Sequence, residues 1–546
     1  MTPDAPRTPI VPRWRYRAAL APALGLALAV THNGAALGQL LPQMGAPVEL
    51  GDLRTAFQRA YGPAGLGAAV GDRAWTFIPA IDLDVTATDN VQGLGLGGSR
   101  KSGDVITSIT PSISIQGASQ RLTGSLFYGP QLRAYMRNSS QNSVAQNLNA
   151  SAKATIFEDL LFLNASAYMA EYSRSGGLGG GASGRLSKAD RVQTSSFSVG
   201  PQLRHAFSDY GVADLSHSFS LLTQRGQALR ANTPFAPAVT PGNTTINNTQ
   251  ASFSSGQAFG RLNFAVTLAR IAYDGPGVLK NAHRNSEMLD LGYAVTRGVT
   301  LLGQVGHQDV QYGGTQKIRV NGAIWSVGAR WNPDPDTIIT VRYGYRDGGA
   351  SYSFEGSTAP TARTRVAASY SDGMANAAEE LQNSLGRTRI SNSGITIDPV
   401  TGMPVILNNN FSGAQGGLAR VKRISVSGVL TGDVDVFSLT LNRDERTTLS
   451  SDVPGAAPAI SFMNVSGAWQ RELGPGVRGN AQASYGERSA GGFGSQQVMT
   501  LSTGVSWALS ETLSTRATYT FTHASASQRG FGYQANLVSL GLRKTF

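Results

Sequence analysis

The sequence contains no cysteine among its 546 residues. This absence excludes disulfides, thiolate metal sites, thiol nucleophiles and the lipid-bearing cysteine of a lipoprotein. Charged residues make up only 15% of the chain, whereas a disordered chain is more charged and poorer in aromatics. After residue 40 there is no apolar run of the roughly 18 residues that a membrane-spanning helix requires. Disordered and helical membrane classes are therefore both disfavoured.

Glycine is abundant, with 65 residues, and the mean hydropathy of −0.14 is near neutral. From Trp75 to the end, the dominant pattern is alternation with a period of two. Successive side chains of a strand point to opposite faces, so such segments have one apolar and one polar face. In residues 121–136 the apolar parity contains Leu122, Leu126, Tyr128, Leu132, Ala134 and Met136.

The same alternation recurs around Trp325, Tyr343, Tyr485 and Trp507, and aromatic residues often lie near the ends of these segments. Short turns and long Gly-, Ser-, Asn- and Pro-rich connections also alternate along the chain. Bacterial barrels have short turns on the periplasmic side, long loops outside and aromatic girdles at both interfaces. The sequence therefore predicts an all-β, transmembrane antiparallel up-and-down β-barrel of about 20–22 strands, an even number, in residues 74–546 of a bacterial outer-membrane protein.

The first 38 residues have the features of a secretory signal peptide, with a basic region and the apolar run 18–30. An uncleaved signal anchor is the alternative. Residues 39–73 are expected to form a loose periplasmic leader. At the other end, Leu540, Leu542 and Phe546 share a parity, and a terminal aromatic on an amphipathic last strand resembles the signal that the barrel-assembly machinery reads.

Residues 372–421 interrupt the pattern and are predicted to form a partly helical insertion. Within it, 376–385 has helical spacing, and an apolar patch follows at 404–407. Counting strand directions from both ends predicts that 362–371 and 422–431 both run towards the periplasm. Two arrangements remain open: a short upward strand near 403–411, or a segment that threads the lumen as a plug. We expect a short strand together with partial occlusion of the lumen.

The search for catalytic motifs gives little. The sequence has no G-x-S-x-G elbow and no Walker loop, and its histidines are scattered without metal-ligand spacing. Gly-rich 93–98 follows a strand without opening a helix, which indicates an extracellular loop. Three carboxylates, Asp82, Asp84 and Asp89, could bind a divalent cation, although ordinary lumen and loop carboxylates are the simpler interpretation.

His307 and Asp309 could form a pair at the barrel rim, as in an outer-membrane hydrolase. A single pair is weak support for catalysis. We therefore expect no catalytic residue, no metal site, no cofactor and no enzymatic activity.

Arginine is frequent on the polar face. Inward carboxylates are fewer by parity, with Asp435 and Asp444 as the clearest cases. Excess positive charge between low-dielectric walls concentrates anions, and arginine binds carboxylate, phosphate or sulfate in a bidentate manner. The alternative is that these arginines pair with lumen acids, with the insertion or with lipopolysaccharide. Parity directs the following arginines inward: Arg133, Arg204, Arg330, Arg342, Arg346, Arg363, Arg365, Arg423, Arg478, Arg488 and Arg516.

Three segments carry a family resemblance: 81–91, 369–373 and 442–447, with the sequences IDLDVTATDNV, SYSDG and NRDERT. Together they resemble a family of outer-membrane β-barrel proteins found with exosortase (PEP-CTERM) and exopolysaccharide gene clusters. The resemblance covers about residues 75–546. It implies a part in exporting or anchoring extracellular polymer and brings no catalytic residues.

The leading hypothesis is a passive outer-membrane channel or export conduit for an anionic solute or exopolysaccharide, without covalent chemistry. A structural or adhesion barrel with an occluded lumen is the second hypothesis, and a rim-sited hydrolase is the third. The expected partners are outer-membrane lipid, lipopolysaccharide, the barrel-assembly machinery and an anionic polysaccharide. Nucleic acid is not expected despite the pI of about 9.9, because the basic groups would lie inside the barrel.

Overall fold

The computed structural model describes residues 75–91, 101–173, 188, 191–226, 242–314, 316–376, 378–380, 389–390, 396–397, 417–451, 459–491, 494–527 and 532–546. The predicted signal peptide (1–38) and leader (39–73) lie outside these residues. Among the described residues, no helix is long and apolar enough to span a membrane.

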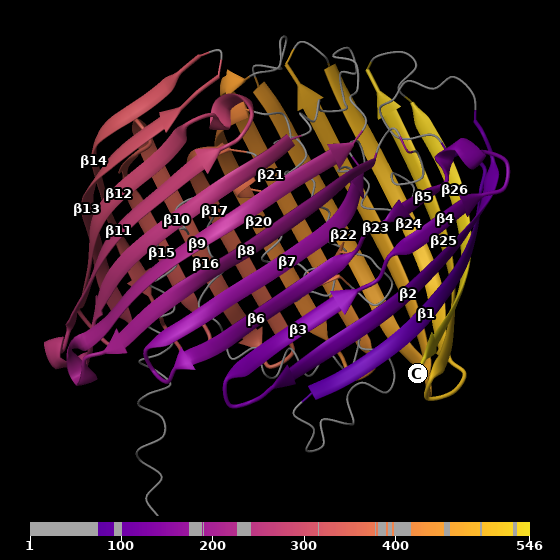
Figure 1. Ribbon diagram of the computed structural model, residues 1–546, viewed down its shortest axis with the longest axis horizontal. Helices are drawn as coiled ribbons and strands as arrows, with labels where there is room; N and C mark the ends of the chain where they lie inside the picture. The colour runs from indigo at the N-terminus through magenta and orange to yellow at the C-terminus, as the bar shows by residue number, and fades with distance from the viewer. Residues whose placement is uncertain are drawn as a thin grey trace, which may run out of the picture.

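The strands form one closed antiparallel barrel, in which the first and last strands lie side by side (Figure 1). β1 (Trp75–Thr88) pairs with β2 (Asp104–Ala118) on one edge and with β26 (Tyr533–Thr545) on the other. The main sheet contains 24 strand segments, of which two pairs each make a single crossing, so the wall has 22 crossings. The predicted antiparallel barrel with an even strand number is confirmed.

The two divided crossings are β3 (Leu122–Tyr128) with β4 (Gln131–Tyr135), and β5 (Ser143–Ala145) with β6 (Leu148–Phe157). β3 and β4 continue one register against β2 on either side of Gly129 and Pro130. Proline has no N–H for the ladder, so it interrupts a strand.

The remaining strands of the wall follow in chain order, each paired with the next: β7 (Leu161–Ser173), β8 (Arg191–Ala206), β9 (Gly211–Gly226), β10 (Gly242–Ser255), β11 (Leu262–Asp274), β12 (Ala282–Ala294), β13 (Val299–Tyr312), β14 (Ile318–Trp331), β15 (Ile338–Arg346), β16 (Gly349–Thr361), β17 (Thr364–Asn376), β20 (Gly417–Thr431), β21 (Asp435–Ser451), β22 (Ala459–Gly474), β23 (Val477–Ala490), β24 (Gly494–Ala508) and β25 (Leu513–Ala526).

The two ends of the barrel differ. One end carries the tight turns, such as 362–363 and 475–476, and the other carries the long connections, including 174–190 and 377–416. Short turns identify the periplasmic end of a bacterial barrel. Several of the connections follow the predicted alternation, but β15 and β16 are joined at the extracellular end by only two residues, 347–348.

The outer face of the wall is apolar. Leu501 and Val505 on β24, Trp507 near its end, and Leu540 and Leu542 on β26 are all exposed, although they are apolar. An exposed apolar band around a closed barrel is the surface that lipid covers. The chain is therefore an outer-membrane protein, as predicted. Phe546 is also exposed next to β26, and a role of these three C-terminal residues in assembly stays a prediction.

The sorting of faces can be tested with one pair of neighbouring residues. On β20, Val426 points outward and Ser427 inward. We expect Val426→Arg to destabilise the folded barrel by about 2–4 kcal/mol, because a cation near the bilayer midplane loses its hydration. Ser427→Arg adds the same side chain to the lumen face and should cost much less. Urea titration of vesicle-embedded protein measures both; equal costs would contradict the assigned faces.

The direction predicted for 362–371 is wrong. β17 begins at a periplasmic turn and runs outward, and β20 pairs with it directly in antiparallel register. No upward strand between them is needed, so the short strand expected near 403–411 is not part of the wall; that segment itself lies outside the described residues. The sequence misleads here because breaks within a crossing make the number of segments differ from the number of crossings.

The described part of the insertion enters the barrel. It starts as a buried helical turn, 378–380, in agreement with the predicted helical stretch. A small hairpin follows, formed by β18 (Arg389–Ile390) and β19 (Thr396–Ile397), and β18 lies against β6. Ten crossings separate β17 from β6 in either direction around the wall. The two described parts of the insertion therefore lie against walls on opposite sides of the barrel.

An apolar cluster, here called the mouth core, closes part of the extracellular end. It joins the upper inner faces of β7–β13 to the ends of β17 and β20 and to the helical turn of the insertion. The turn η7 (Gly277–Leu279) reaches across to β20 and β21. The mouth core contains Tyr168, Ala170, Val192, Leu222, Ile246, Ile271, Tyr273, Val278, Leu279, Ala282, Val310, Tyr312, Met374, Ala378 and Leu418.

Candidate lumen site

Most of the predicted arginines line the lumen. Each has the parity opposite to the exposed apolar residues of its strand, as Arg342 has between Val341 and Tyr343. The inward arginines are Arg133, Arg204, Arg330, Arg342, Arg346, Arg365, Arg423, Arg478, Arg488 and Arg516.

Arg363 departs from this prediction. It lies in the turn between β16 and β17, with its side chain 60% exposed, and its Nη2 donates to Asp433 of the next periplasmic turn at 2.6 Å. A turn residue belongs to neither face, so parity gives no direction there. Asp435, predicted to face inward, shares the outer face with Phe437 and accepts a hydrogen bond from Trp469 Nε1 at 2.8 Å. It is the first residue of β21, at the membrane boundary, where an outward charge remains hydrated.

Lumen carboxylates are more numerous than parity alone indicates, and they neutralise several arginines. Arg342 Nη1 lies 3.5 Å from Asp290. Arg133 Nη1 binds Glu171 at 2.5 Å, although Glu171 has the outward parity of the exposed Leu163 on β7. Arg346 instead donates to Gln304 at 3.2 Å. The upper lumen is therefore a network of compensated charges rather than a continuous positive field.

The densest group of these charges holds the insertion. Glu380 Oε1 accepts hydrogen bonds from Arg423 Nη2 at 2.8 Å and from Arg446 Nη2 at 2.9 Å, and Glu380 Oε2 lies 2.6 Å from Arg446 Nη1. Arg423 also binds both carboxylate oxygens of Asp444, through Nε at 3.0 Å and Nη2 at 2.8 Å. We call these four residues the latch cluster. They tie the helical turn of the insertion to the inner face of β20 and β21.

The latch cluster is almost dry, since Glu380 is 3% exposed and Asp444 has no exposed surface. Charge-assisted hydrogen bonds in such surroundings are strong, but each ion has lost its hydration. Removing one partner leaves an uncompensated buried charge, which typically costs about 3–5 kcal/mol. The position of the insertion thus depends on a few ion pairs.

Glu379 next to the latch cluster is a second buried carboxylate. Its Oε1 accepts a hydrogen bond from Tyr312 at 3.3 Å, whereas Oε2 has no partner among the described residues. Burial and the neighbouring Glu380 raise the pKa of Glu379 well above its usual value of 4.5. The helical turn therefore carries one carboxylate that binds two arginines and, beside it, one that is readily protonated.

This arrangement predicts a pH dependence. A raised pKa means that the stability contributed by protonated Glu379 is complete below pH 4.5 and is lost as the pH rises through the raised pKa. We expect the insertion to loosen over that range and the open probability in planar bilayers to rise with it. Glu379→Gln should flatten the profile, whereas the exposed Glu445→Gln should leave it unchanged. An unaltered profile in Glu379→Gln would contradict this role.

Three inward arginines stand apart at the periplasmic end: Arg204, Arg330 and Arg365 lie within three residues of the turns that bound β8, β14 and β17. None of them has a carboxylate within 4.0 Å among the described residues, and all three are half-buried. We call them the periplasmic arginines. Asp214 faces Arg204 across the β8–β9 ladder, and Glu355 interacts electrostatically with Arg330, so the periplasmic mouth carries arginines that lack a direct ion pair.

The carboxylates considered as a cation site bind protein groups, as the simpler interpretation expects. Asp82 Oδ2 accepts from Arg543 Nη1 at 3.0 Å, and Asp84 accepts from Arg516 Nη2 at 2.6 and 2.7 Å. Asp89 accepts hydrogen bonds from the backbone and side chain of Asn536, which lower its pKa although burial opposes the shift. In the described part of the chain, no group of three His, Asp or Glu residues is arranged to hold a metal ion.

His307 and Asp309 do not form the predicted rim pair. His307 Nε2 contacts Asn321 Oδ1 at 3.1 Å, and Asp309 Oδ2 contacts His283 Nε2 at 3.3 Å. Both residues share the outward parity of the exposed Val305. The sequence analysis did not identify three residues that form these ion pairs: Glu380, Arg446 and Arg543. Arg446 and Arg543 are indicated only by their parity on a strand, and Glu380 only by its place in the insertion.

No family model matches the chain, and no curated protein matches it. Solved structures with a similar arrangement include the FrpB iron transporter from Neisseria meningitidis, at 10% identity and a TM-score of 0.49, covering 90% of this chain and 84% of that one. The siderophore receptor PirA from Acinetobacter baumannii has 7% identity and a TM-score of 0.46, and the match covers 89% of this chain and 84% of that one. The ferric-catecholate import receptor Fiu from E. coli has 11% identity and a TM-score of 0.46, and the match covers 86% of this chain and 81% of that one. Likeness at this level assigns no function to the chain.

Proposed function

We propose that the protein is a gated outer-membrane conduit for an anionic polymer, with exopolysaccharide as the cargo class. The observation that carries the proposal is the distribution of lumen charge. Several arginines higher in the lumen lie within 4.0 Å of a carboxylate, whereas none of the three periplasmic arginines does among the described residues. Cations without a direct ion pair at the mouth of a low-dielectric passage attract anions from that side.

The insertion supplies the gate. Its described parts lie against opposite walls, and the latch cluster holds its first turn against β20 and β21. The resemblance of 81–91, 369–373 and 442–447 to barrels of exopolysaccharide gene clusters supports a polysaccharide cargo. The mouth core favours the second candidate, a structural barrel whose lumen stays closed.

Planar-bilayer recordings separate the two. The recordings use wild type and Glu380→Gln, in which the latch is weakened. A conduit should give anion-selective current in Glu380→Gln, and a polyuronate added on the periplasmic side should block it while neutral dextran should not. The triple variant Arg204→Gln, Arg330→Gln, Arg365→Gln in the same background should lose both selectivity and block. Silence in both proteins would favour the structural barrel.

A further inference from the structure

In the described part of the wall, the junction between β5 and β7 has no backbone ladder. β5 pairs with β4 alone, and β7 pairs with β6 only as far as Met169. Beyond that point Ala170–Ser173 pair with β8 alone. Among the described residues, no backbone hydrogen bond joins β5 to β7. The gap opens towards the extracellular end of the barrel.

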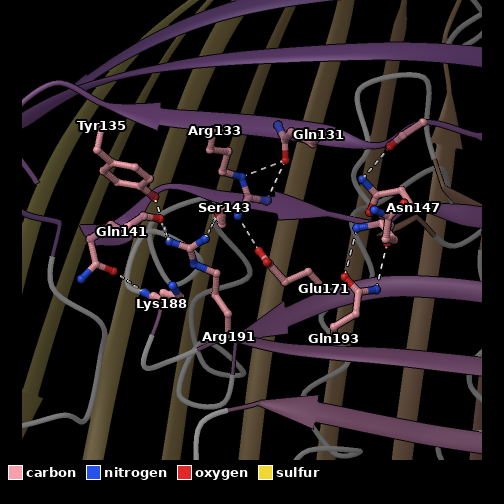
Figure 2. A network of polar contacts seen from close by, with 12 residues as sticks. Gln131, Arg133, Tyr135, Gln141, Ser143, Asn147, Glu171, Lys188, Arg191 and Gln193 are labelled. Carbon is pink, nitrogen blue, oxygen red and sulfur yellow. Dashed lines mark hydrogen bonds and ion pairs between the residues drawn. The ribbon is translucent and has the colours of Figure 1, made fainter. Parts of the chain in front are cut away.

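Side chains close this gap (Figure 2). Arg133 of β4 reaches Glu171 of β7 at 2.5 Å. Arg191 of β8 donates through Nη1 to Ser143 Oγ of β5, and through Nη2 to the hydroxyl of Tyr135 at 3.2 Å. Glu171 and Arg191 are both buried, at 8% and 5% exposure.

Gln193 of β8 makes the contact most like a strand pair. Its Oε1 accepts from the backbone N–H of Gln146 at 3.0 Å, and its Nε2 donates to the carbonyl of Gln146 at 2.9 Å. A side-chain amide thus takes the place of a neighbouring strand at this residue. We call these contacts of β4 and β5 with β7 and β8 the side-chain seam.

The seam separates the lumen from lipid. Arg133 and Tyr135 point inward, whereas Glu171, Arg191 and Gln193 share the outward parity of the exposed Leu163 and Phe197, so β4 and β5 overlap the outer side of β7 and β8 at the seam. On the other face of β4 and β5, Leu132 and Val144 are exposed, as is Met136 directly after β4. Exposed apolar side chains at the extracellular half of the wall lie in the outer leaflet. An opening here would therefore connect the lumen with the acyl chains of that leaflet.

Opening the junction between β5 and β7 breaks no backbone ladder, unlike the separation of two paired strands. In hydrocarbon each unpaired backbone group costs several kcal/mol, which is why barrels are closed. Side chains that separate can exchange their hydrogen bonds for bonds to water. The junction between β5 and β7 requires mainly such side-chain rearrangements.

We propose that the side-chain seam is a lateral exit, through which an amphiphilic molecule with an anionic head and an acyl chain passes from the lumen into the outer leaflet. Arg133 and Arg191 are the cations that would guide the head, and the apolar outer face of β4 and β5 receives the chain. The exit rests on the proposed conduit for its cargo, although the opening itself can be tested without it.

The first test uses the absence of native cysteine. Ala145→Cys places the sole thiol on β5 at a fully buried position. Vesicles contain a phospholipid that carries a maleimide on an acyl chain. We expect labelling to accelerate at least tenfold in Glu171→Gln with Gln193→Ala. The control Asp290→Asn removes an ion pair to Arg342 inside a continuous ladder and should not accelerate it. Equal rates in all three proteins, or equal acceleration by the control, would overturn the exit.

The second test separates exit from conduit. Gln146→Cys and Gln193→Cys are joined by a short bismaleimide in the Glu380→Gln background. Ion current should persist, while transfer of a fluorescent acylated dicarboxylate into the outer leaflet should stop. Continued transfer, or loss of current together with transfer, would overturn a separate exit. Absence of current before crosslinking would instead reject the conduit, while the labelling rates would still decide whether the seam opens.

Discussion

Replacing Glu380 with glutamine is expected to raise the open probability of the barrel at least tenfold. Glutamine retains an acceptor for one arginine but no charge, so Arg423 and Arg446 lose a shared buried counter-ion. Loss of one partner from a buried pair costs about 3–5 kcal/mol. A change of about 1.4 kcal/mol is already enough to shift the equilibrium between the closed and open barrel tenfold. Single-channel recording of refolded protein in planar bilayers measures the change.

A matched control lies on the outer face of β21, the strand that carries Arg446. Glu445 of β21 binds Arg443 at 2.6 Å, with both side chains about half exposed. Exposed pairs contribute little, so Glu445→Gln should leave the open probability unchanged. If Glu380→Gln recorded the same open probability as wild type, the latch cluster would not hold the gate. If both variants opened the barrel, the cause would be general loosening of β21.

The wall of the barrel could be predicted from sequence because each strand carries its own information. Alternation at Leu501, Val505 and Trp507 assigns both the strand and its outer face, and the structure exposes all three side chains to the outside. Hydrophobic partitioning fixes these positions residue by residue, with no need to know which strands are neighbours. The same rule placed most of the lumen arginines correctly.

Pairing between distant residues could not be predicted in this way. Parity directs Arg423 inward but cannot reveal that Glu380, from an insertion without alternation, meets it there. Likewise Arg133 and Glu171 meet across a missing ladder. Parity also assumes a residue inside a strand, so it fails for Arg363 in a turn. The expected charge excess was therefore too large, because the compensating acids come from connections and from other strands.

Closure of the barrel should depend on a similar pairing. Asp82 and Asp84 of β1 bind Arg543 of β26 and Arg516 of β25, which joins the first strand to the last two. The double variant Asp82→Asn with Asp84→Asn leaves two arginines without counter-ions in the lumen wall. We expect the free energy of unfolding to fall by about 3–5 kcal/mol, with a smaller share from Arg516 because that side chain is partly hydrated. The urea midpoint of unfolding should fall accordingly.

The partner residues allow this prediction to be assigned to the pair itself. The charge exchange Asp82→Arg with Arg543→Asp restores opposite charges across the β1–β26 contact and should recover part of the stability that each single change removes. A double-mutant cycle then gives the coupling energy directly, since the two side chains touch. Additive losses in that cycle would mean that the backbone ladder between Ala80–Thr88 and Leu537–Thr545 closes the barrel without help from these ions. A coupling of 1 kcal/mol or more, on the order found for residues in contact, would identify the ion pairs as part of the closure.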